Sequence, residues 1–129
     1  MITEDYVSFE TAKLLKEKGF DEATLGYYLD DKDKLYFDRF SDDWNSNHVG
    51  YISAPTLQMA MKWLEEEKEY IVYPYPVSDG KKIEWRYSVW FDNGYMFLGQ
   101  ILEYGTDESF NTREEATEAG IKYCLENLI

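Results

Sequence analysis

The chain has 129 residues, a length typical of one domain, and we expect residues 1–129 to form a single globular domain. Asp and Glu number 26 against 13 Lys and Arg, and the net charge of -13 argues against direct binding to nucleic acid or to an anionic membrane, because both need a basic face. No run of about 18 apolar residues predicts a membrane span, the N-terminus lacks signal-peptide regions, and a single cysteine excludes an intramolecular disulfide, so we expect a cytoplasmic protein.

The N-terminal region predicts a helix followed by a hairpin. The helix covers residues 9–18, with Ser8 as its N-cap and Gly19 at the C′ position. Strands follow at 24–29 and 35–40, and the polar, turn-prone DDKDK between them indicates a chain reversal.

Residues 41–50, SDDWNSNHVG, predict a loop because they are dense in Ser, Asp and Asn and carry no apolar period. A second helix is predicted next, with Pro55 in its first turn and the EEEKE run at 65–69 as its end. Its apolar stripe, spaced i, i+3, i+4 and i+7, consists of Leu57, Ala60, Met61 and Leu64.

Three strands are predicted after this helix. The segment 70–77, YIVYPYPV, is best placed at a sheet edge, because Pro74 and Pro76 each lack a donor for the hydrogen-bond ladder. Strands 83–91 and 95–103 then form a hairpin around the turn dipeptide Asn-Gly.

The last predicted helix covers residues 113–128 and begins at a capping box formed by Thr112 and Glu115. Ala116, Gly120 and Cys124 follow one turn apart and predict a small-residue face packed on the sheet. The element order αββαβββα predicts an α+β fold with a mainly antiparallel sheet and helices packed on that sheet.

Asn93-Gly94 predicts a type I′ turn, and such a turn fixes the register of the hairpin. In that register Phe91 lies opposite Met96, Trp90 opposite Phe97 and Val89 opposite Leu98. The predicted core face carries Ile83, Trp85, Tyr87, Val89 and Phe91 with Met96, Leu98, Gln100, Leu102 and Tyr104. We expect Trp85, Val89 and Leu98 to be buried.

Three aromatic residues fall on the other face of this hairpin, Trp90, Tyr95 and Phe97, and we call them the aromatic patch. Their neighbours on that face include Glu84, Arg86 and Ser88. Either a helix or the loop at 41–50 covers the patch, or it forms a cross-strand pair that stabilises the hairpin. Alternatively it is partly exposed and forms the centre of a contact with another protein or a second copy, because aromatic residues ringed by polar ones are typical of interface cores.

The sequence singles out no catalytic residue, metal ligand or cofactor-binding residue, and we expect no cofactor. One histidine and one cysteine exclude a Cys/His zinc site within the chain, and Cys124 is expected to be a buried thiol and no partner of His48 in catalysis. Asp30, Asp31 and Asp33 resemble part of a calcium loop, but Tyr36 and Asp42 stand at the sixth and twelfth positions counted from Asp31, where Gly and Glu are required.

Much of the acidic excess lies in Asp42, Asp43, Glu65, Glu66, Glu67, Glu69, Asp107, Glu108, Glu114, Glu115 and Glu118. These side chains are interpreted as solvated helix faces and caps that keep the protein soluble. Alternatively, they imitate a phosphate backbone and bind a basic protein that handles DNA or RNA.

Three stretches carry a resemblance to a known group of proteins: SFETAKLLKEKGFD at 8–21, APT at 54–56 followed by KWLEE, and TREEATEAGIKYCLENLI at 112–129. In these stretches the chain resembles small uncharacterised proteins encoded in gut Bacteroidales genomes and their phages or prophages. The resemblance implies a shared fold and source, and it implies no activity and no site residues.

These observations together favour a protein-binding module that works without catalysis and contacts a protein partner or a second copy of itself. Two alternatives from other classes stay open. One is the acidic mimic of nucleic acid, and the other is a small enzyme that uses carboxylates which the sequence does not single out.

Overall fold

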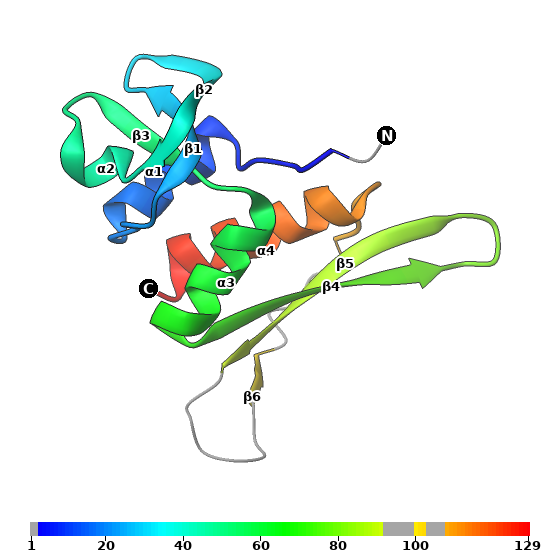
Figure 1. Cartoon of the computed structure of the whole chain (residues 1–129). Helices are drawn as coiled ribbons and strands as arrows, with labels where there is room; N and C mark the ends of the chain where they lie inside the picture. The colour runs from blue at the N-terminus through cyan, green and yellow to red at the C-terminus, as the bar shows by residue number, and fades with distance from the viewer. Residues whose placement is uncertain (1–2, 92–99, 103–107) are drawn as a thin grey trace. The chain divides into compact units, whose positions relative to one another are not determined.

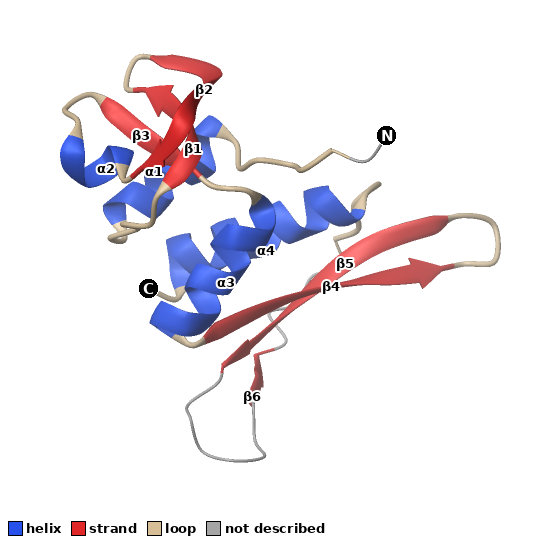
Figure 2. Ribbon diagram, in the orientation of Figure 1, coloured by secondary structure: helices blue, strands red, loops and turns tan. Residues whose placement is uncertain are grey.

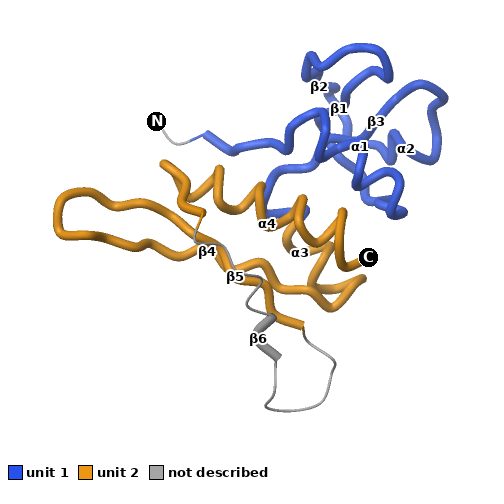
Figure 3. Tube along the Cα trace, turned by 180° about the vertical axis from the view of Figure 1, so that it is seen from behind, with its two compact units in different colours: residues 1–60 blue, residues 61–129 orange. Residues whose placement is uncertain are grey.

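The computed structural model describes residues 3–91, 100–102 and 108–129 (Figures 1 and 2). The elements, in chain order, are α1 (Phe9–Glu17), β1 (Thr24–Leu29), β2 (Lys32–Asp42), α2 (Trp44–Asn47), β3 (Tyr51–Ala54), α3 (Leu57–Lys68), β4 (Tyr70–Ser78), β5 (Ile83–Phe91), β6 (Gln100–Leu102) and α4 (Arg113–Asn127). They fall into two compact units, residues 1–60 and residues 61–129, which Figure 3 colours separately. Each unit contains one three-stranded sheet with a helix packed against it.

Helix α1 begins and ends within one residue of its predicted bounds. The Ser8 hydroxyl accepts a hydrogen bond from the Thr11 N–H at 3.3 Å, as an N-cap does. Gly19 has a φ of 94°, and the N–H groups of Gly19 and Phe20 donate to the carbonyls of Lys16 and Leu15. These two bonds form a Schellman motif, so the predicted cap is confirmed.

Strand β1 lies in the centre of the first sheet, between β2 and β3. Its hairpin with β2 is confirmed, and the turn is tight, because Leu29 pairs with Lys32 across Asp30 and Asp31. β2 is longer than predicted at both ends. Its pairing with β1 shifts register between Phe37 and Asp42, where β2 carries extra residues in a β-bulge.

Helix α1 covers one face of this sheet. Leu15 of α1, Tyr28 of β1 and Ile52 of β3 are buried there. The Tyr28 hydroxyl donates to the Val7 carbonyl at 2.8 Å, so the one polar atom of this buried ring has a partner. The core of residues 1–60 therefore lies between α1 and the sheet.

The loop predicted at 41–50 is wrong in part, because most of this segment is ordered by its own side chains. Trp44 is buried, and its indole N–H donates to the Thr24 carbonyl at 2.8 Å. The Asp43 carboxylate accepts from the Ser46 N–H at 3.1 Å and caps the short helix α2. A composition rich in Asp, Ser and Asn is typical of helix caps as well as loops, and composition alone does not separate the two.

Strand β3 directly follows this segment and was not predicted. The side-chain amide of Asn45 ties it to α2, since its oxygen accepts from the Ser53 N–H at 2.9 Å and its nitrogen donates to the Phe20 carbonyl at 2.8 Å. With four residues, β3 is too short to show a clear alternation of apolar and polar side chains in the sequence.

Helix α3 begins later than predicted. Thr56 caps it, because the Thr56 hydroxyl accepts from the Met59 N–H at 3.1 Å. Pro55 therefore precedes the cap instead of lying in the first turn, and its carbonyl accepts from the Val7 N–H at 3.0 Å. The predicted stripe is confirmed in that Leu57, Ala60 and Leu64 are buried, while Met61 is half-buried.

The second sheet is built on a hairpin of β4 and β5, which pair from Tyr70 opposite Phe91 to Ser78 opposite Ile83. β5 lies between β4 and β6, so β4 is an edge strand, as predicted. An edge position leaves the two prolines of β4 without a neighbour that needs their missing N–H groups. The prediction that Pro74 and Pro76 belong to an edge is therefore confirmed.

The register predicted for the β5–β6 pair is wrong. Phe91 pairs with Gln100, Trp90 with Ile101 and Val89 with Leu102, which places each partner four residues further along than a turn at Asn93-Gly94 requires. A shift by an even number of residues keeps every side chain on its face, so the alternation of apolar residues does not distinguish the two registers. The Asn93-Gly94 dipeptide itself, like Leu98, lies outside the described residues.

Helix α4 packs on β4 and β5 through its predicted small-residue face. Ala116, Gly120 and Cys124 are all buried. Its start is also confirmed, since the Thr112 hydroxyl accepts from the Glu115 N–H at 3.1 Å and the Glu115 carboxylate accepts from the Asn111 N–H at 3.2 Å.

The predicted α+β class with antiparallel pairing and helices packed on strands is confirmed, and the predicted elements occur in the predicted order with α2 and β3 added. The strands form two sheets where one was expected. That residues 1–129 form a single domain stays a prediction. None of the described helices is both long and apolar enough to cross a lipid bilayer.

Candidate protein-contact surface

The predicted aromatic patch is only partly within the described structure. Trp90 lies near the end of β5 and is half-buried, so its side chain is partly exposed. Tyr95 and Phe97 lie outside the described residues. β4 is a described strand that pairs with β5 at Trp90, and it contributes to the same surface.

Antiparallel pairing assigns the side chains of the β4–β5 hairpin to two faces. One face carries Val72 and Val89 opposite each other, and Tyr87 opposite Pro74. Val72, Tyr87 and Val89 are buried, and α4 covers them. The approach is close, because a Cβ atom on Gly120 would lie 2.5 Å from Val72 Cγ1. This is the core face of the hairpin.

The opposite face is the candidate site, and we call it the open face. It consists of Ile71, Tyr73, Tyr75 and Val77 of β4 with Glu84, Arg86, Ser88 and Trp90 of β5. None of these eight side chains is buried, and Tyr73 is 55% exposed. Tyr73 and Tyr75 stack on each other with ring centroids 6.2 Å apart. The open face is therefore an accessible sheet surface rich in aromatic residues.

Trp90 lies opposite Ile71 on the open face. Its indole N–H donates to the Ser88 hydroxyl at 3.2 Å, two residues earlier on the same face. The bond satisfies the one polar atom of the ring and fixes the ring along the strand. An apolar ring held in one position loses little conformational freedom when a partner covers it.

Polar groups border the apolar part of the open face. The Glu84 carboxylate lies 2.8 Å from the Lys82 ammonium, which holds the pKa of Glu84 below its ordinary value. The Arg86 guanidinium donates to the Ser109 hydroxyl at 3.1 Å. An apolar centre with a hydrogen-bonded polar border is the composition of a protein interface.

Sequence reasoning missed the contribution of β4 to this surface. The signal was present, because Ile71, Tyr73, Tyr75 and Val77 alternate with Val72, Pro74 and Pro76 along YIVYPYPV. Alternation alone does not say which set is covered. That choice needs the pairing of β4 with β5, and the signal for that pairing is Asp79-Gly80, a dipeptide typical of hairpin turns, between the two strands.

Three described residues predicted for the core face are not buried, Ile83, Trp85 and Phe91, the last of which is half-buried. Ile83 is 62% exposed, because it lies at the end of β5 next to the β4–β5 turn. Trp85 is half-buried, and the Arg113 guanidinium lies over its ring at 4.7 Å from the centroid. The Trp85 backbone pairs with Phe110 through two hydrogen bonds of 2.8 Å and 2.7 Å. Val89 is buried, as predicted.

Other candidates for chemistry are accounted for by local structure. Cys124 is buried, and burial raises the pKa of its thiol to about 12, so the reactive thiolate is absent at neutral pH. His48 Nε2 lies 2.8 Å from Asp42 Oδ2 and therefore has a carboxylate partner. Among the described residues, no three His, Cys, Asp or Glu side chains gather closely enough to hold a metal ion.

Comparisons of the chain with protein-family models, with curated proteins and with solved structures give no match.

Proposed function

We propose that the protein is a binding module that contacts another protein through the open face of the β4–β5 hairpin, without catalysis. The observation that carries the proposal is the contrast between the two faces. α4 covers the core face, whereas the open face leaves Tyr73, Tyr75 and Trp90 accessible. Aromatic side chains of this kind dominate the energy of protein interfaces.

A protein fits this surface better than a small molecule does. The open face follows two long strands, so its aromatic groups extend along the sheet, whereas small ligands bind in concave sites that enclose them. A partner strand is less suited to pair with the backbone of β4, because Pro74 and Pro76 lack N–H donors at the outer edge of this strand. The contact is therefore expected to use side chains of the open face.

Charge decides between a second copy and a different protein. With a net charge of -13, two copies repel each other, which opposes self-association at low ionic strength. A neutral or basic partner gains long-range attraction from the same charge. We therefore propose a different protein with an apolar contact patch and a neutral or basic border.

We further propose that this contact takes place in the cytosol of a bacterium or of a phage-infected bacterium. The resemblance to small proteins of gut Bacteroidales and their phages supports this origin, and the lone, buried Cys124 agrees with a reducing compartment.

The test compares three tagged baits, the wild type, the double variant Tyr73→Ala/Trp90→Ala and Phe40→Ala, in native-host lysate with mass spectrometry. Phe40 is a matched control, because this aromatic side chain is 77% exposed and lies on β2 in the other unit. The candidate partner is then purified, and its affinity for each bait is measured.

We expect the double variant to lose at least about tenfold in affinity while Phe40→Ala binds like the wild type, because truncation at an interface centre typically costs more than about 1.4 kcal/mol. Equal binding by all three baits contradicts the role of the open face. A different outcome favours the acidic mimic instead. In it, the captured protein is basic and handles nucleic acid, it binds the double variant as well as the wild type, and its binding is lost in high salt.

A further inference from the structure

A second group of aromatic side chains lies in the other unit, on the face of the first sheet that α1 does not cover. Tyr36, Tyr27 and Tyr51 occupy β2, β1 and β3, and we call them the tyrosine row. Tyr27 stacks on Tyr36 with ring centroids 5.6 Å apart and planes 17° apart, and it lies 5.1 Å from Tyr51. All three are half-buried, in contrast to Tyr28 on the α1 side.

The tyrosine row is held rigidly from one end. The buried Trp44 ring stacks on Tyr51 at 5.6 Å and contacts Tyr27 at 4.6 Å. The His48 ring lies 5.3 Å from Tyr51 and is fixed by Asp42, whose other oxygen accepts from the Asn47 amide at 2.8 Å. The Asn47 and His48 hydrogen bonds lower the pKa of Asp42, so this carboxylate is ionised at neutral pH.

The environment of the row is electrostatically suited to a cation. Asp38 follows Tyr36 by two residues on β2, and the pKa of Tyr27 is raised, first by burial and then by Tyr51, Asp38 and Tyr36. Residues 1–60 keep the two-to-one excess of acidic over basic side chains of the whole chain. Ring faces add an attraction for positive charge.

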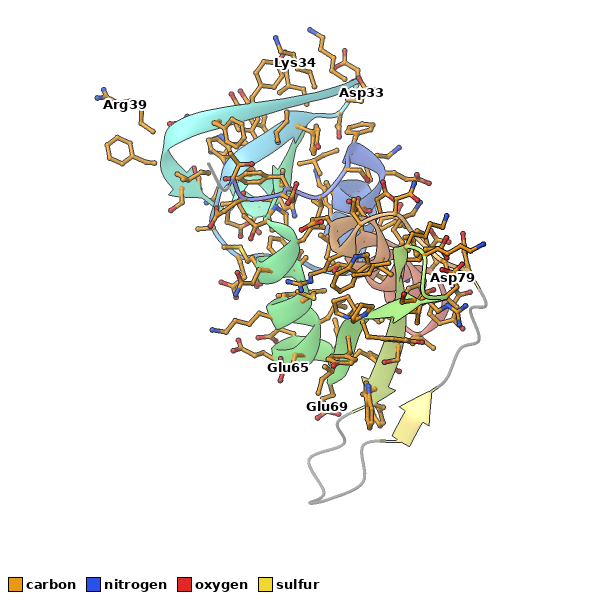
Figure 4. The ribbon with its side chains drawn as sticks, turned by 90° about the vertical axis from the view of Figure 1, so that its right-hand side faces the viewer. Asp33, Lys34, Arg39, Glu65, Glu69 and Asp79 are labelled. Atoms are coloured by element: carbon orange, nitrogen blue, oxygen red, sulfur yellow. The ribbon has the colours of Figure 1, made fainter. Side chains whose placement is uncertain are left out.

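The chain itself places a cation on the row. The Lys34 ammonium lies 5.2 Å from the centroid of Tyr36, on the outermost ring. Among the described residues Lys34 forms no salt bridge, and it is exposed near the β1–β2 turn (Figure 4). An exposed lysine side chain held by a single ring contact is readily displaced by a cation that binds better.

Asp38 is positioned to select such a cation. Its Oδ1 atom accepts from the Arg39 N–H at 2.6 Å and from the Phe40 N–H at 3.3 Å within the β2 bulge. Those bonds fix the carboxylate, and its Oδ2 atom has no hydrogen bond among the described residues. A guanidinium can stack on an aromatic ring and pair with a carboxylate at once, whereas an ammonium has no flat face to stack.

From this geometry we infer that the tyrosine row and Asp38 form a recognition site for an arginine side chain of a basic partner segment. The arginine takes the place of Lys34 on Tyr36 and pairs with Asp38. The site lies in residues 1–60 and shares no residue with the open face, so its test does not depend on the proposed function.

The experiment is a titration of the isotope-labelled full chain with acetyl-Gly-Arg-Gly-Arg-Gly-amide, followed by NMR at low salt. The same peptide with Lys in place of Arg tests the choice of cation. Two variants test the site, Tyr36→Leu and Asp38→Asn, the second of which keeps an oxygen that can accept the two bulge N–H bonds.

Asp79→Asn is the matched control. Asp79 also accepts backbone N–H bonds through Oδ1, from Lys81 and Lys82, and its loss removes the same charge from the β4–β5 turn (Figure 4). Removing one carboxylate at either place changes the net charge equally, so only a local contact separates the two variants.

We expect the Arg peptide to change the amide chemical shifts mainly in β1, β2 and β3, and to bind more tightly than the Lys peptide. Tyr36→Leu and Asp38→Asn should each lower the affinity for the Arg peptide by at least about threefold. Asp79→Asn should bind like the wild type. Any of three results would overturn the inference. They are an equal loss of affinity in Asp38→Asn and Asp79→Asn, an equal affinity of the wild type for the Lys and Arg peptides, and chemical-shift changes spread over the whole surface. The amide spectrum of each variant checks that the sheet is intact.

Discussion

Gly120 shows how one missing side chain sets the distance between a helix and a sheet. A Cβ atom at this position would lie 2.5 Å from Val72 Cγ1 and 3.1 Å from the Tyr87 ring. Val72 and Tyr87 are buried, so neither can move aside without disturbing the core. Glycine is therefore required here by space, even though it is a poor helix former.

Gly120→Ala should lower the free energy of unfolding by about 1–2 kcal/mol, because an overpacking cost of about 2–3 kcal/mol outweighs the roughly 1 kcal/mol that alanine gains in helix propensity. Urea denaturation followed by circular dichroism measures the change. Glu126→Ala, an exposed substitution on the same helix, is the control and should be nearly neutral. If Gly120→Ala proves as stable as the wild type, the close packing of α4 on β4 and β5 is wrong.

Cys124 belongs to the same buried surface, and its position was predictable while the contacts of Gly120 were not. The spacing of Ala116, Gly120 and Cys124 by one helical turn identifies the covered face from sequence. Which strand side chains meet that face depends on the register of β4 against β5. The sequence does not fix that register, because Asp79-Gly80 is typical of a two-residue turn that would pair Ser78 with Lys81, whereas Ser78 pairs with Ile83 across residues 79–82.

At the scale of elements, the junction between α3 and β4 carries a residue in an unfavourable conformation. Glu69 has a φ of 63°, in the left-handed region that glycine adopts without strain. It stands at the position after the helix end where glycine is the usual residue. The chain turns here directly from helix into strand.

Glu69→Gly should raise the free energy of unfolding by about 1 kcal/mol, because it removes the strain of the left-handed conformation. Glu65→Gly, the same exchange inside α3, should lower it by about 1 kcal/mol (Figure 4). Thermal or urea denaturation of the pair gives changes of opposite sign if the helix ends at Lys68. A loss of stability in both variants would place Glu69 inside a longer helix.

Elements with local signals were predictable, and elements set by distant contacts were not. The N-caps Ser8 and Thr112 mark two helices through bonds to residues three positions away. By contrast, α2 and β3 depend on Trp44 reaching Thr24 and on Asn45 reaching Phe20, contacts between residues far apart in sequence. The predicted register of the β5–β6 pair was wrong for a related reason, since a shift by an even number of residues leaves the alternation of apolar and polar residues unchanged.

At the scale of the whole molecule, both units follow one plan. Each has a three-stranded antiparallel sheet with one face covered by a helix, α1 in one unit and α4 in the other. In each, the face away from that helix carries half-exposed aromatic side chains, the tyrosine row in one and the open face in the other.

For the candidate site, the type of surface was predicted from the sequence, but only some of its residues were. Trp90 could be placed opposite the core face from alternation alone. Tyr73 and Tyr75 were not placed beside it, because their position depends on β4 pairing with β5, which Asp79-Gly80 indicates but the predicted order of strands did not use. Two of the three predicted patch residues, Tyr95 and Phe97, lie outside the described residues, and their place in the patch stays a prediction.

The central claim is that neighbouring residues of β5 lie on two different kinds of surface, and the free energy of unfolding of Val89→Ala and Trp90→Ala tests it most directly. Val89 is 1% exposed beneath α4, so its truncation should cost about 2 kcal/mol, whereas Trp90→Ala should cost at most about 1 kcal/mol. The opposite ranking, with Trp90→Ala losing about 3–5 kcal/mol, would show that the indole belongs to a packed core and would contradict the open face.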